Sequence, residues 1–298
     1  MKIKSIKKYT TRFKKMAFGG EPDEEVLASH TFFDEKGNLV AEEKIDDEEG
    51  ILEVNKYTYD ASGKMLKHEL IMEAEGISEV YEFNRDEKGR LLSEIKYYGE
   101  DPGEKTEYTY STHDQPITIA RYDADGEPES FEKIVYNERD LLVEHHKMGP
   151  DQKHVETTKI DYNEKDAPVE KRVYDNKDKL IRTTLISYND KGELVRITEK
   201  NGDGIVISDI VSTYDDRGNV IQRKIRDFHS RTLRFEFDEN DNCITEEVFD
   251  ENGNLTMKSN FEFDENKNLL TESGYFMDMN RSAQMANTQS RYEYEYYT

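Results

Sequence analysis

Residues 57–66 read Tyr-Thr-Tyr-Asp-Ala-Ser-Gly-Lys-Met-Leu, and related stretches recur along the whole chain. The two tyrosines stand two residues apart, so they fall on one face of a β-strand, where aromatic rings pack well. Asp60 can accept hydrogen bonds from backbone N–H groups further on, which starts a turn. Gly63 tolerates the left-handed conformation that closes a type I turn with a bulge, and Met65 and Leu66 resume an extended segment. The stretch predicts strand, turn, strand.

Copies of this motif recur with nearly constant spacing. From Ser111 to Asp215 the residue that starts the turn recurs every 26 residues, four times in succession. The clearest copies begin at Tyr57, Tyr81, Tyr108, Ile134, Ile160, Ile186, Ser212, Phe235 and Phe261, with an earlier copy at Thr31 and a terminal one at Tyr292. We expect positive φ at the residues in the place of Gly63, which include Gly37, Gly192, Gly218, Asp140, Asp166 and Asp241.

A second, weaker turn lies in the middle of each repeat, as at Tyr122–Gly126 and Phe249–Gly253. Each unit of about 26 residues then holds two strands, which gives roughly 20–22 strands in all. Open sheets seldom exceed about 10 strands without curling. We therefore predict an all-β fold, a single elongated, coiled antiparallel β-meander built from two-strand repeats. A β-solenoid with the same period is the alternative.

The composition favours a thin structure. Hydrophobic residues make up 34% of the 298 residues and charged residues 36%, whereas typical domains hold about 45–50% and about 25%. A thick central core cannot be built from this composition. The 19 tyrosines and 13 phenylalanines nevertheless argue against disorder, because disordered segments are poor in aromatic residues.

The charge is strongly acidic, with 42 Lys and Arg against 66 Asp and Glu, a net charge of −24. This disfavours nucleic acid as a partner, because binding it requires clustered basic residues, and it favours a basic protein instead. Residues 1–15 hold seven basic residues and no acidic one. We expect a basic first strand that lies against acidic neighbours; a membrane or RNA patch is the alternative.

Cys243 is the only cysteine, so no intrachain disulfide forms. The basic start of the chain is not followed by an apolar segment of the kind that a secretory signal requires. No run approaches the ~18 apolar residues of a membrane span. We expect a cytoplasmic protein, or an exported one if a signal upstream has been removed.

The pattern Tyr-x-Tyr-Asp-x-x-Gly-x-Leu, as at Tyr57–Leu66 and Tyr214–Ile221, resembles the repeat of the YD-repeat (Rhs-repeat) family over about residues 30–270. In that family, long arrays coil into hollow shells that enclose a toxic C-terminal domain, and shorter arrays occur beside toxins or as surface proteins. The resemblance implies a β-hairpin array with a binding or structural role. Two features depart from the family: the array is short, and the Asp-Pro-x-Gly-rich core that follows the repeats is missing.

Patterns that carry catalysis or bind metals are weak. His145 and His146 are adjacent in an expected strand, so they face opposite sides and cannot easily share a metal with each other; His154 lies nearby. Acidic turns such as Asp123–Gly126 could offer oxygen ligands to Ca²⁺, but the turns themselves require the same residues. No Gly-x-Ser-x-Gly nucleophile motif occurs. We expect a protein that is not an enzyme, without cofactor or metal.

The repeat breaks near the C-terminus, which sets the expected organisation. We predict a basic N-terminal strand or cap at 1–29, hairpin repeats at 30–273, and an irregular insert with a capping strand at 274–298. The insert carries several methionines, which suit adaptable interfaces. The predicted partner-binding residues are Tyr275, Phe276, Met277, Met279 and Met285. Alternatively, the segment only caps the last strand, because repeat arrays need atypical ends.

The predicted function is a non-catalytic protein-binding module. Its concrete form would be the neutralisation or chaperoning of a basic toxin or effector. The alternative is a structural or surface protein, either a component of a larger shell or an adhesin that binds carbohydrate.

Overall fold

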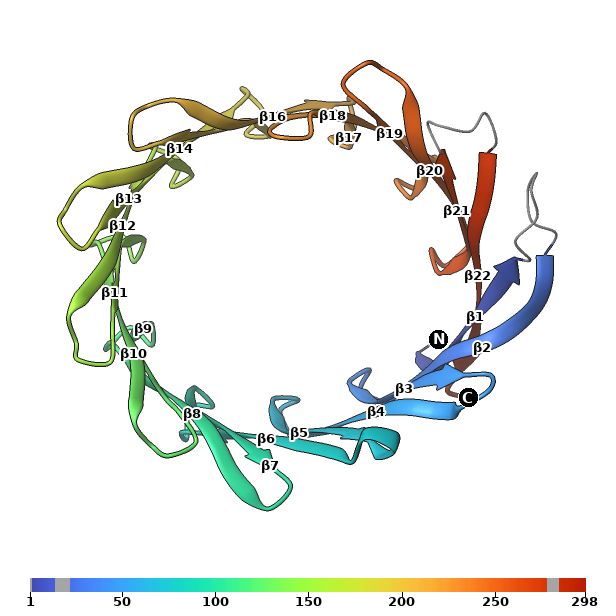
Figure 1. Cartoon of the computed structure of the whole chain (residues 1–298), viewed down its shortest axis with the longest axis horizontal. Coiled ribbons are helices and arrows are strands. Elements are labelled where there is room, and N and C mark those ends of the chain that lie inside the picture. Colours follow the sequence, from blue (N-terminus) through green and yellow to red (C-terminus); the bar gives the residue numbers. More distant parts are fainter. Residues whose placement is uncertain (1, 14–21, 278–283) are drawn as a thin grey trace. The chain divides into compact units, whose positions relative to one another are not determined.

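The computed structural model describes residues 2–13, 22–277 and 284–298. In these ranges the chain forms strands and one short 3-10 helix, η1 at Glu73–Glu75 (Figure 1). No helix there is long and apolar enough to cross a membrane. The strands are β1 Ile3–Phe13, β2 Pro22–Phe33, β3 Leu39–Asp46, β4 Gly50–Tyr59, β5 Met65–Met72, β6 Ile77–Arg85, β7 Leu91–Tyr98, β8 Asp101–Tyr110, β9 Pro116–Tyr122, β10 Pro128–Tyr136, β11 Leu142–Met148, β12 His154–Tyr162, β13 Pro168–Asp175, β14 Leu180–Tyr188, β15 Leu194–Asn201, β16 Val206–Tyr214, β17 Val220–Arg226, β18 Arg231–Phe237, β19 Cys243–Phe249, β20 Leu255–Phe263, β21 Leu269–Met277 and β22 Gln284–Tyr296.

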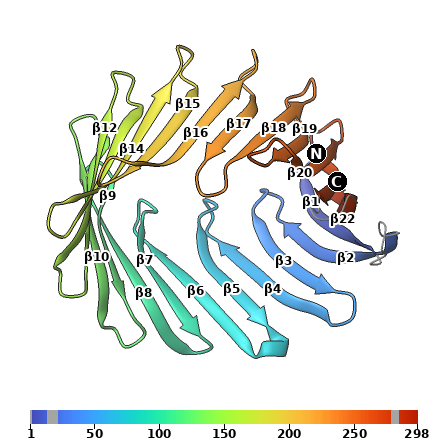
Figure 2. The same cartoon turned by 45° about the horizontal axis from the view of Figure 1, so that its top comes forward.

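The chain divides into two units. Unit 1 comprises Met1–Leu52, Ser187–Thr198 and Ser208–Thr298, and unit 2 comprises Glu53–Ile186 and Glu199–Ile207. Within unit 2, each strand from β5 to β13 pairs antiparallel with the next (Figure 2). Within unit 1 the same holds from β16 to β22. The antiparallel pairing of successive hairpins is confirmed, and the parallel solenoid alternative is wrong.

The predicted open, elongated meander is also wrong. Within unit 1, β1 pairs antiparallel with β22 as well as with β2. An open meander would leave these first and last strands as its two free edges. The strands instead belong to one 22-stranded sheet in which β1 and β22 pair with each other, so neither of these strands is a free edge. Pairing the terminal strands removes the exposed N–H and C=O groups that an open sheet presents at its edges.

The basic first strand lies against an acidic neighbour, as the charge pattern predicts. Lys7 stands opposite Glu293 in the register of β1 and β22. The Lys4 ammonium lies 3.8 Å from a carboxylate oxygen of Glu295. Both side chains of that pair are half exposed, so the pair contributes little to stability.

Few side chains are fully buried, in keeping with the polar composition. Among the described residues, the buried hydrophobic side chains are Ile134 and Val173. The buried polar ones are Ser5, Asn55, Thr157, Thr158, Asp209, Ser212, Thr245 and Ser290. The sheet is therefore stabilised by strand pairing and by contacts between neighbouring side chains on each face, and not by a central apolar core.

The two aromatic positions of each motif share one face of the sheet, which we call the tyrosine face. In unit 2, His68 on β5 stands opposite Tyr57 on β4 and Tyr81 on β6. Its ring stacks on both tyrosine rings, with centroids 4.7 and 5.4 Å apart. The alternation expected of a strand is thus confirmed, because aromatic residues two positions apart project to the same side.

The motif turns have the predicted chemistry. Asp60 Oδ1 accepts hydrogen bonds from the backbone N–H of Ser62 (2.8 Å) and of Lys64 (2.9 Å). The Ser62 hydroxyl also donates to this oxygen, and these bonds lower the pKa of Asp60 below its ordinary value. The bond from the backbone N–H four residues further on recurs at turns that begin at Asp34, Asp86, Ser111, Asn137, Asn163, Asn189, Asp215, Asp238 and Asp264.

The fourth turn residue has positive φ, as predicted. Gly192 and Gly218 have φ of +86° and +92°. Asp140, Asp166 and Asp241 have φ of 59°, 61° and 64°. Aspartate is among the few non-glycine residues that visit this region, so the turn accepts it.

Replacing Gly192 with alanine is expected to lower the free energy of unfolding by about 1–2 kcal/mol. At this φ the Cβ of an L residue comes too close to the following carbonyl oxygen. No atom lies within 4 Å of the added Cβ, so the loss is conformational. Urea unfolding would measure it. Gly149→Ala is the control, because Gly149 has no positive φ and its added Cβ would make ordinary contacts, at 3.6 Å or more. Equal losses in both variants would contradict the assignment.

The strands that follow the motif turns begin with a β-bulge. Tyr59 pairs with Met65 and Thr58 with Lys67, so Leu66 is the extra residue. A bulge interrupts the ladder of backbone hydrogen bonds, and a tyrosine hydroxyl on the next strand donates to a carbonyl at this point. These hydroxyl bonds run from Tyr110 to Leu91, Tyr136 to Pro116, Tyr162 to Leu142 and Tyr214 to Leu194, at 2.7–3.0 Å. The second tyrosine of the motif thus has a defined role.

The copy at Tyr81 departs from the predicted register. The motif places its turn at Asn84, but the turn begins at Asp86 and positive φ falls on Gly89. Arg85 occupies the place of the second aromatic residue, and its Nε and Nη2 each donate to the Met65 carbonyl at 3.3 Å. The glycine three residues after Asp86 was the signal, because Asn84 has no glycine at that spacing.

Candidate functional site

The predicted partner-binding residues lie on two strands and the segment between them. Tyr275, Phe276 and Met277 belong to β21, and Met285 to β22, opposite Phe276. Residues 274–277 and 284–290 are therefore strand and not irregular. Met279 lies outside the described residues. The role of these five residues in binding a partner stays a prediction.

The motif turns instead reveal a different candidate. Successive turns are joined by ion pairs, in which a basic residue of one turn contacts the aspartate at the fourth position of the next. These pairs are Lys88–Asp114 (2.8 Å), His113–Asp140 (2.9 Å), Arg139–Asp166 and Arg217–Asp241 (2.9 Å). The ion pair with the preceding turn thus explains why aspartate occupies a position that otherwise suits glycine.

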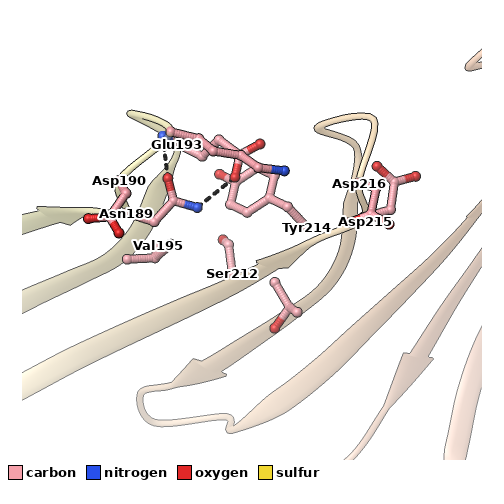
Figure 3. A pocket seen from close by; sticks show the side chains of 10 residues that line it. Asn189, Asp190, Glu193, Val195, Ser212, Tyr214, Asp215 and Asp216 are labelled. Atoms are coloured by element: carbon pink, nitrogen blue, oxygen red, sulfur yellow. Dashed lines mark hydrogen bonds between the residues drawn. The ribbon is translucent and has the colours of Figure 1, made fainter.

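This series of ion pairs is interrupted within unit 1, between the turns that begin at Asn189 and Asp215. The fourth position of the second turn is Gly218, which offers no carboxylate. Lys191, at the place of the basic partner, has no ion pair among the described residues. An open cleft of about 450 Å³ lies there instead (Figure 3), lined by Asn189, Asp190, Lys191, Glu193, Val195, Ser212, Thr213, Tyr214, Asp215 and Asp216.

The cleft is acidic, since four carboxylates line it against one ammonium group. Glu193 is fixed by Asn189, whose Nδ2 donates to Glu193 Oε2 at 2.6 Å and whose Oδ1 accepts from the Glu193 N–H at 3.0 Å. Burial alone would raise the pKa of Asp215, but hydrogen bonds from Asn219 and Arg217 lower it below its ordinary value. Asp215 therefore stays charged well into the acidic range.

Tyr214, Val195 and Ser212 form the floor of the cleft (Figure 3). The Tyr214 hydroxyl donates to the Leu194 carbonyl at 2.7 Å, which fixes the ring over β15. Ser212 is 6% exposed, and its hydroxyl has no hydrogen-bond partner among the described residues. A fixed aromatic ring beneath carboxylates is an arrangement that suits a cation.

The equivalent place in unit 2 is filled by the chain itself. Arg90 has the same position in its turn as Glu193, and its guanidinium lies over the Tyr110 ring, 4.9 Å from the centroid. The same guanidinium contacts Asp86 at 2.6 Å and Asp114 at 2.5 Å. Where Arg90 stands in unit 2, the cleft in unit 1 has a glutamate, so this position supplies no guanidinium to the Tyr214 ring.

The histidines do not form a metal centre in the described ranges, where no group of three or more His, Cys, Asp or Glu residues could hold a metal ion. His145 Nε2 lies 2.6 Å from Glu132 on the tyrosine face. His146 contacts Thr157 Oγ1 at 2.9 Å and Glu144 at 3.1 Å on the other face. The expectation that these adjacent histidines face opposite sides is confirmed.

Sequence reasoning did not identify the cleft. The motif explains Asp215 and Gly218 as turn residues and Tyr214 as a strand residue, so none of them stood out. The usable signal was the fourth turn position, which is aspartate at Asp140 and Asp166 but glycine in both turns of the cleft, at Gly192 and Gly218. That change matters only when the contact between successive turns is known.

Comparison with protein families gives no match to any family model, and comparison with curated proteins gives none either. Solved structures that match in this comparison include a TcdB2–TccC3 complex, 14% identical, with 93% of this chain and 18% of that chain covered and a TM-score of 0.48. A Photorhabdus luminescens Tc holotoxin pore is 13% identical and has a TM-score of 0.47. The match covers 97% of this chain and 19% of that chain. A porin-like protein from Bacteroides uniformis is 10% identical and has a TM-score of 0.32. The match covers 98% of this chain and 96% of that chain. This chain thus spans about a fifth of the Tc toxin chains.

Proposed function

We propose that this chain is a non-catalytic protein-binding module whose cleft above Tyr214 takes an arginine side chain of a basic partner protein. The observation that carries the proposal is Arg90 in unit 2, whose guanidinium lies over Tyr110 and contacts two aspartates. In the cleft the ring and the acidic surroundings are present and the guanidinium is missing. An arginine from another protein would supply it.

The electrostatics support a basic partner. The net charge of −24 accelerates the association of positively charged proteins. Within the cleft, a guanidinium over an exposed ring contributes about 0.5–1 kcal/mol, and charged hydrogen bonds to Glu193 or Asp190 contribute further. In its concrete form, the proposal is that a YD-repeat-type array neutralises or chaperones a basic toxin or effector in the cytoplasm.

The test uses a fluorescein-labelled peptide with alternating glycine and arginine, titrated with the full chain and followed by fluorescence anisotropy. We expect saturable binding at 0.1 M salt that weakens at 1 M salt, because the Debye length falls from about 10 Å to about 3 Å. Glu193→Arg should place a guanidinium over Tyr214, as Arg90 does over Tyr110, and should weaken binding of the peptide at least about tenfold, or about 1.4 kcal/mol.

The matched control is Glu251→Arg, which makes the same change of charge on an exposed residue of a turn outside the cleft. It should change the affinity by less than about threefold, since only long-range attraction is reduced. Equal weakening in both variants, or a peptide that does not bind saturably, would reject the cleft as the site. Self-association in sedimentation without peptide binding would favour the structural alternative.

A further inference from the structure

A second depression lies on the tyrosine face of unit 2, across β11 to β14. Its volume is about 300 Å³, at the lower end of the range for ligand sites. Residues that line it are Leu142, His145, Lys147, Glu156, Thr158, Ile160, Lys171, Val173 and Arg182. Four of these side chains are basic or imidazole and one is acidic, which is unusual in so acidic a chain.

Two histidines occupy the position of Lys171 in their own repeats. On this face each of them receives a partner from the residue 13 positions earlier, which is its diagonal neighbour on the preceding strand. His68 Nε2 contacts Asn55 Oδ1 at 2.7 Å, and His145 Nε2 contacts Glu132 Oε2 at 2.6 Å. The corresponding neighbour of Lys171 is Thr158, because Thr158 pairs with Val173 and Ile160 with Lys171.

Thr158 does not form a hydrogen bond with the Lys171 ammonium. The described part of the chain contains no hydrogen bond or ion pair of the Lys171 ammonium, and none of the Thr158 hydroxyl. Thr158 is nevertheless only 6% exposed, and its side chain lines the depression. The hydroxyl is not one of the buried side-chain atoms without a partner in the described ranges, so it reaches the solvent in the depression, which Lys171 also lines.

The other charges around the depression are already paired. Lys147 Nζ lies 3.1 Å from Glu156 Oε1, and Arg182 Nε lies 2.9 Å from Glu199 Oε1. These pairs give both cations a carboxylate partner. They leave Lys171 as the cation, among the residues that line this depression, that is available to a ligand.

We propose that this depression binds a carboxylate group, which accepts hydrogen bonds from the Lys171 ammonium and the Thr158 hydroxyl. Ile160 and Val173 offer an apolar floor to the carbon chain that bears the carboxylate. The small volume suits a short dicarboxylate or one Glu or Asp side chain. This site lies in unit 2 and is independent of the cleft above Tyr214.

The test is a titration of the ¹⁵N-labelled full chain, followed by NMR, with glutarate, with a peptide Gly-Glu-Gly-Glu-Gly, and with sulfate. We expect saturable shifts of the amides around Thr158 and Lys171 with at least one carboxylate probe. Lys171→Met should weaken binding at least about tenfold, and Thr158→Val about threefold, since valine keeps the size and removes the donor. The control is Lys133→Met, because Lys133 is exposed on the opposite face and has no ion pair in the described ranges.

The probes distinguish the sources of the carboxylate. Binding of glutarate indicates a small metabolite, and binding of the peptide alone indicates an acidic side chain of a protein. The proposal is overturned if neither probe saturates, if sulfate binds as tightly as the carboxylates, or if Lys133→Met weakens binding as much as Lys171→Met. Unchanged affinity in Thr158→Val would show that the Thr158 hydroxyl does not bind the carboxylate.

Discussion

Replacing Asp209 with alanine is expected to lower the free energy of unfolding by about 2–3 kcal/mol. Asp209 is 5% exposed, and its carboxylate accepts bonds from Arg196 Nε (2.7 Å), Arg196 Nη2 (3.1 Å) and the Thr198 hydroxyl (2.8 Å). Hydrogen bonds to charged groups contribute about 1.5–3 kcal/mol. The larger loss of about 3–5 kcal/mol that is typical of broken buried pairs is not expected, because the Arg196 side chain is 53% exposed and water can solvate it.

The effect of Asp209 should depend on pH in a defined direction. The hydrogen bond from Arg196 is the main cause that lowers the pKa of Asp209 below its ordinary value of 3.8. A carboxyl group with a lowered pKa in the folded state stabilises the protein above its unfolded pKa and loses this contribution as the pH falls. The difference between the parent protein and Asp209→Ala should therefore be full at pH 7 and should shrink below about pH 4.

Urea unfolding at pH 7 and at pH 3 would measure both effects. Asp161→Ala is the control. Asp161 also pairs with an arginine, Arg172, on the neighbouring strand, but the Asp161 side chain is 50% exposed. Exposed pairs contribute about 0–1 kcal/mol. A loss at Asp209 no larger than the loss at Asp161 would show that burial does not strengthen this pair.

Local structure was predictable from the sequence because each motif contains the residues that determine its own strands and turn. The Tyr-x-Tyr alternation fixes which side chains share a face, and the Asp or Asn with a following Gly or Asp fixes the turn. Positive φ at Gly192 and at Asp140 follows from these local rules alone. Within the described ranges, the predicted register failed at the copy that begins at Tyr81, where Arg85 stands in an aromatic position.

The pairing of the first strand with the last was not predictable from the motif, because it depends on twist and curvature accumulated over many strands. The sequence did hold a complementary sign. Lys7 and its basic neighbours open the chain, and Glu293 and Glu295 alternate with tyrosines at its end. That complementarity was interpreted only as a basic strand beside acidic neighbours, without identifying the last strand as the partner.

The two candidate sites were hidden for a related reason. Each is recognised by a missing partner, at Gly218 for the cleft and at Thr158 for the depression. A missing partner becomes visible only after the contacts between neighbouring repeats are known. Composition and motif spacing report what a repeat contains, and they do not report which contact is absent.

Replacing Tyr136 and Tyr162 together with phenylalanine is expected to lower the free energy of unfolding by about 2 kcal/mol at pH 7. Each hydroxyl donates to a carbonyl at the bulge of the preceding strand, at 3.0 Å and 2.7 Å. A net contribution of about 1 kcal/mol per bond is typical, and the carbonyl left without a donor accounts for much of it. Tyr174→Phe is the control, because the Tyr174 hydroxyl has no hydrogen bond within the described ranges.

The same pair of tyrosines should make the protein sensitive to alkali. Burial raises the pKa of Tyr136 and of Tyr162 above the ordinary value of 10.0. Above pH 10 the unfolded chain releases these protons more readily than the folded chain, so the folded state loses stability as the pH rises through its own pKa values. An ionised phenolate also cannot donate to a carbonyl. The stability difference of about 2 kcal/mol between the parent protein and the double variant should therefore shrink above pH 10. Urea unfolding at pH 7, 10 and 11.5 would follow it, and a difference that stays constant across this range would mean that the two hydroxyls do not hold their protons in these bonds.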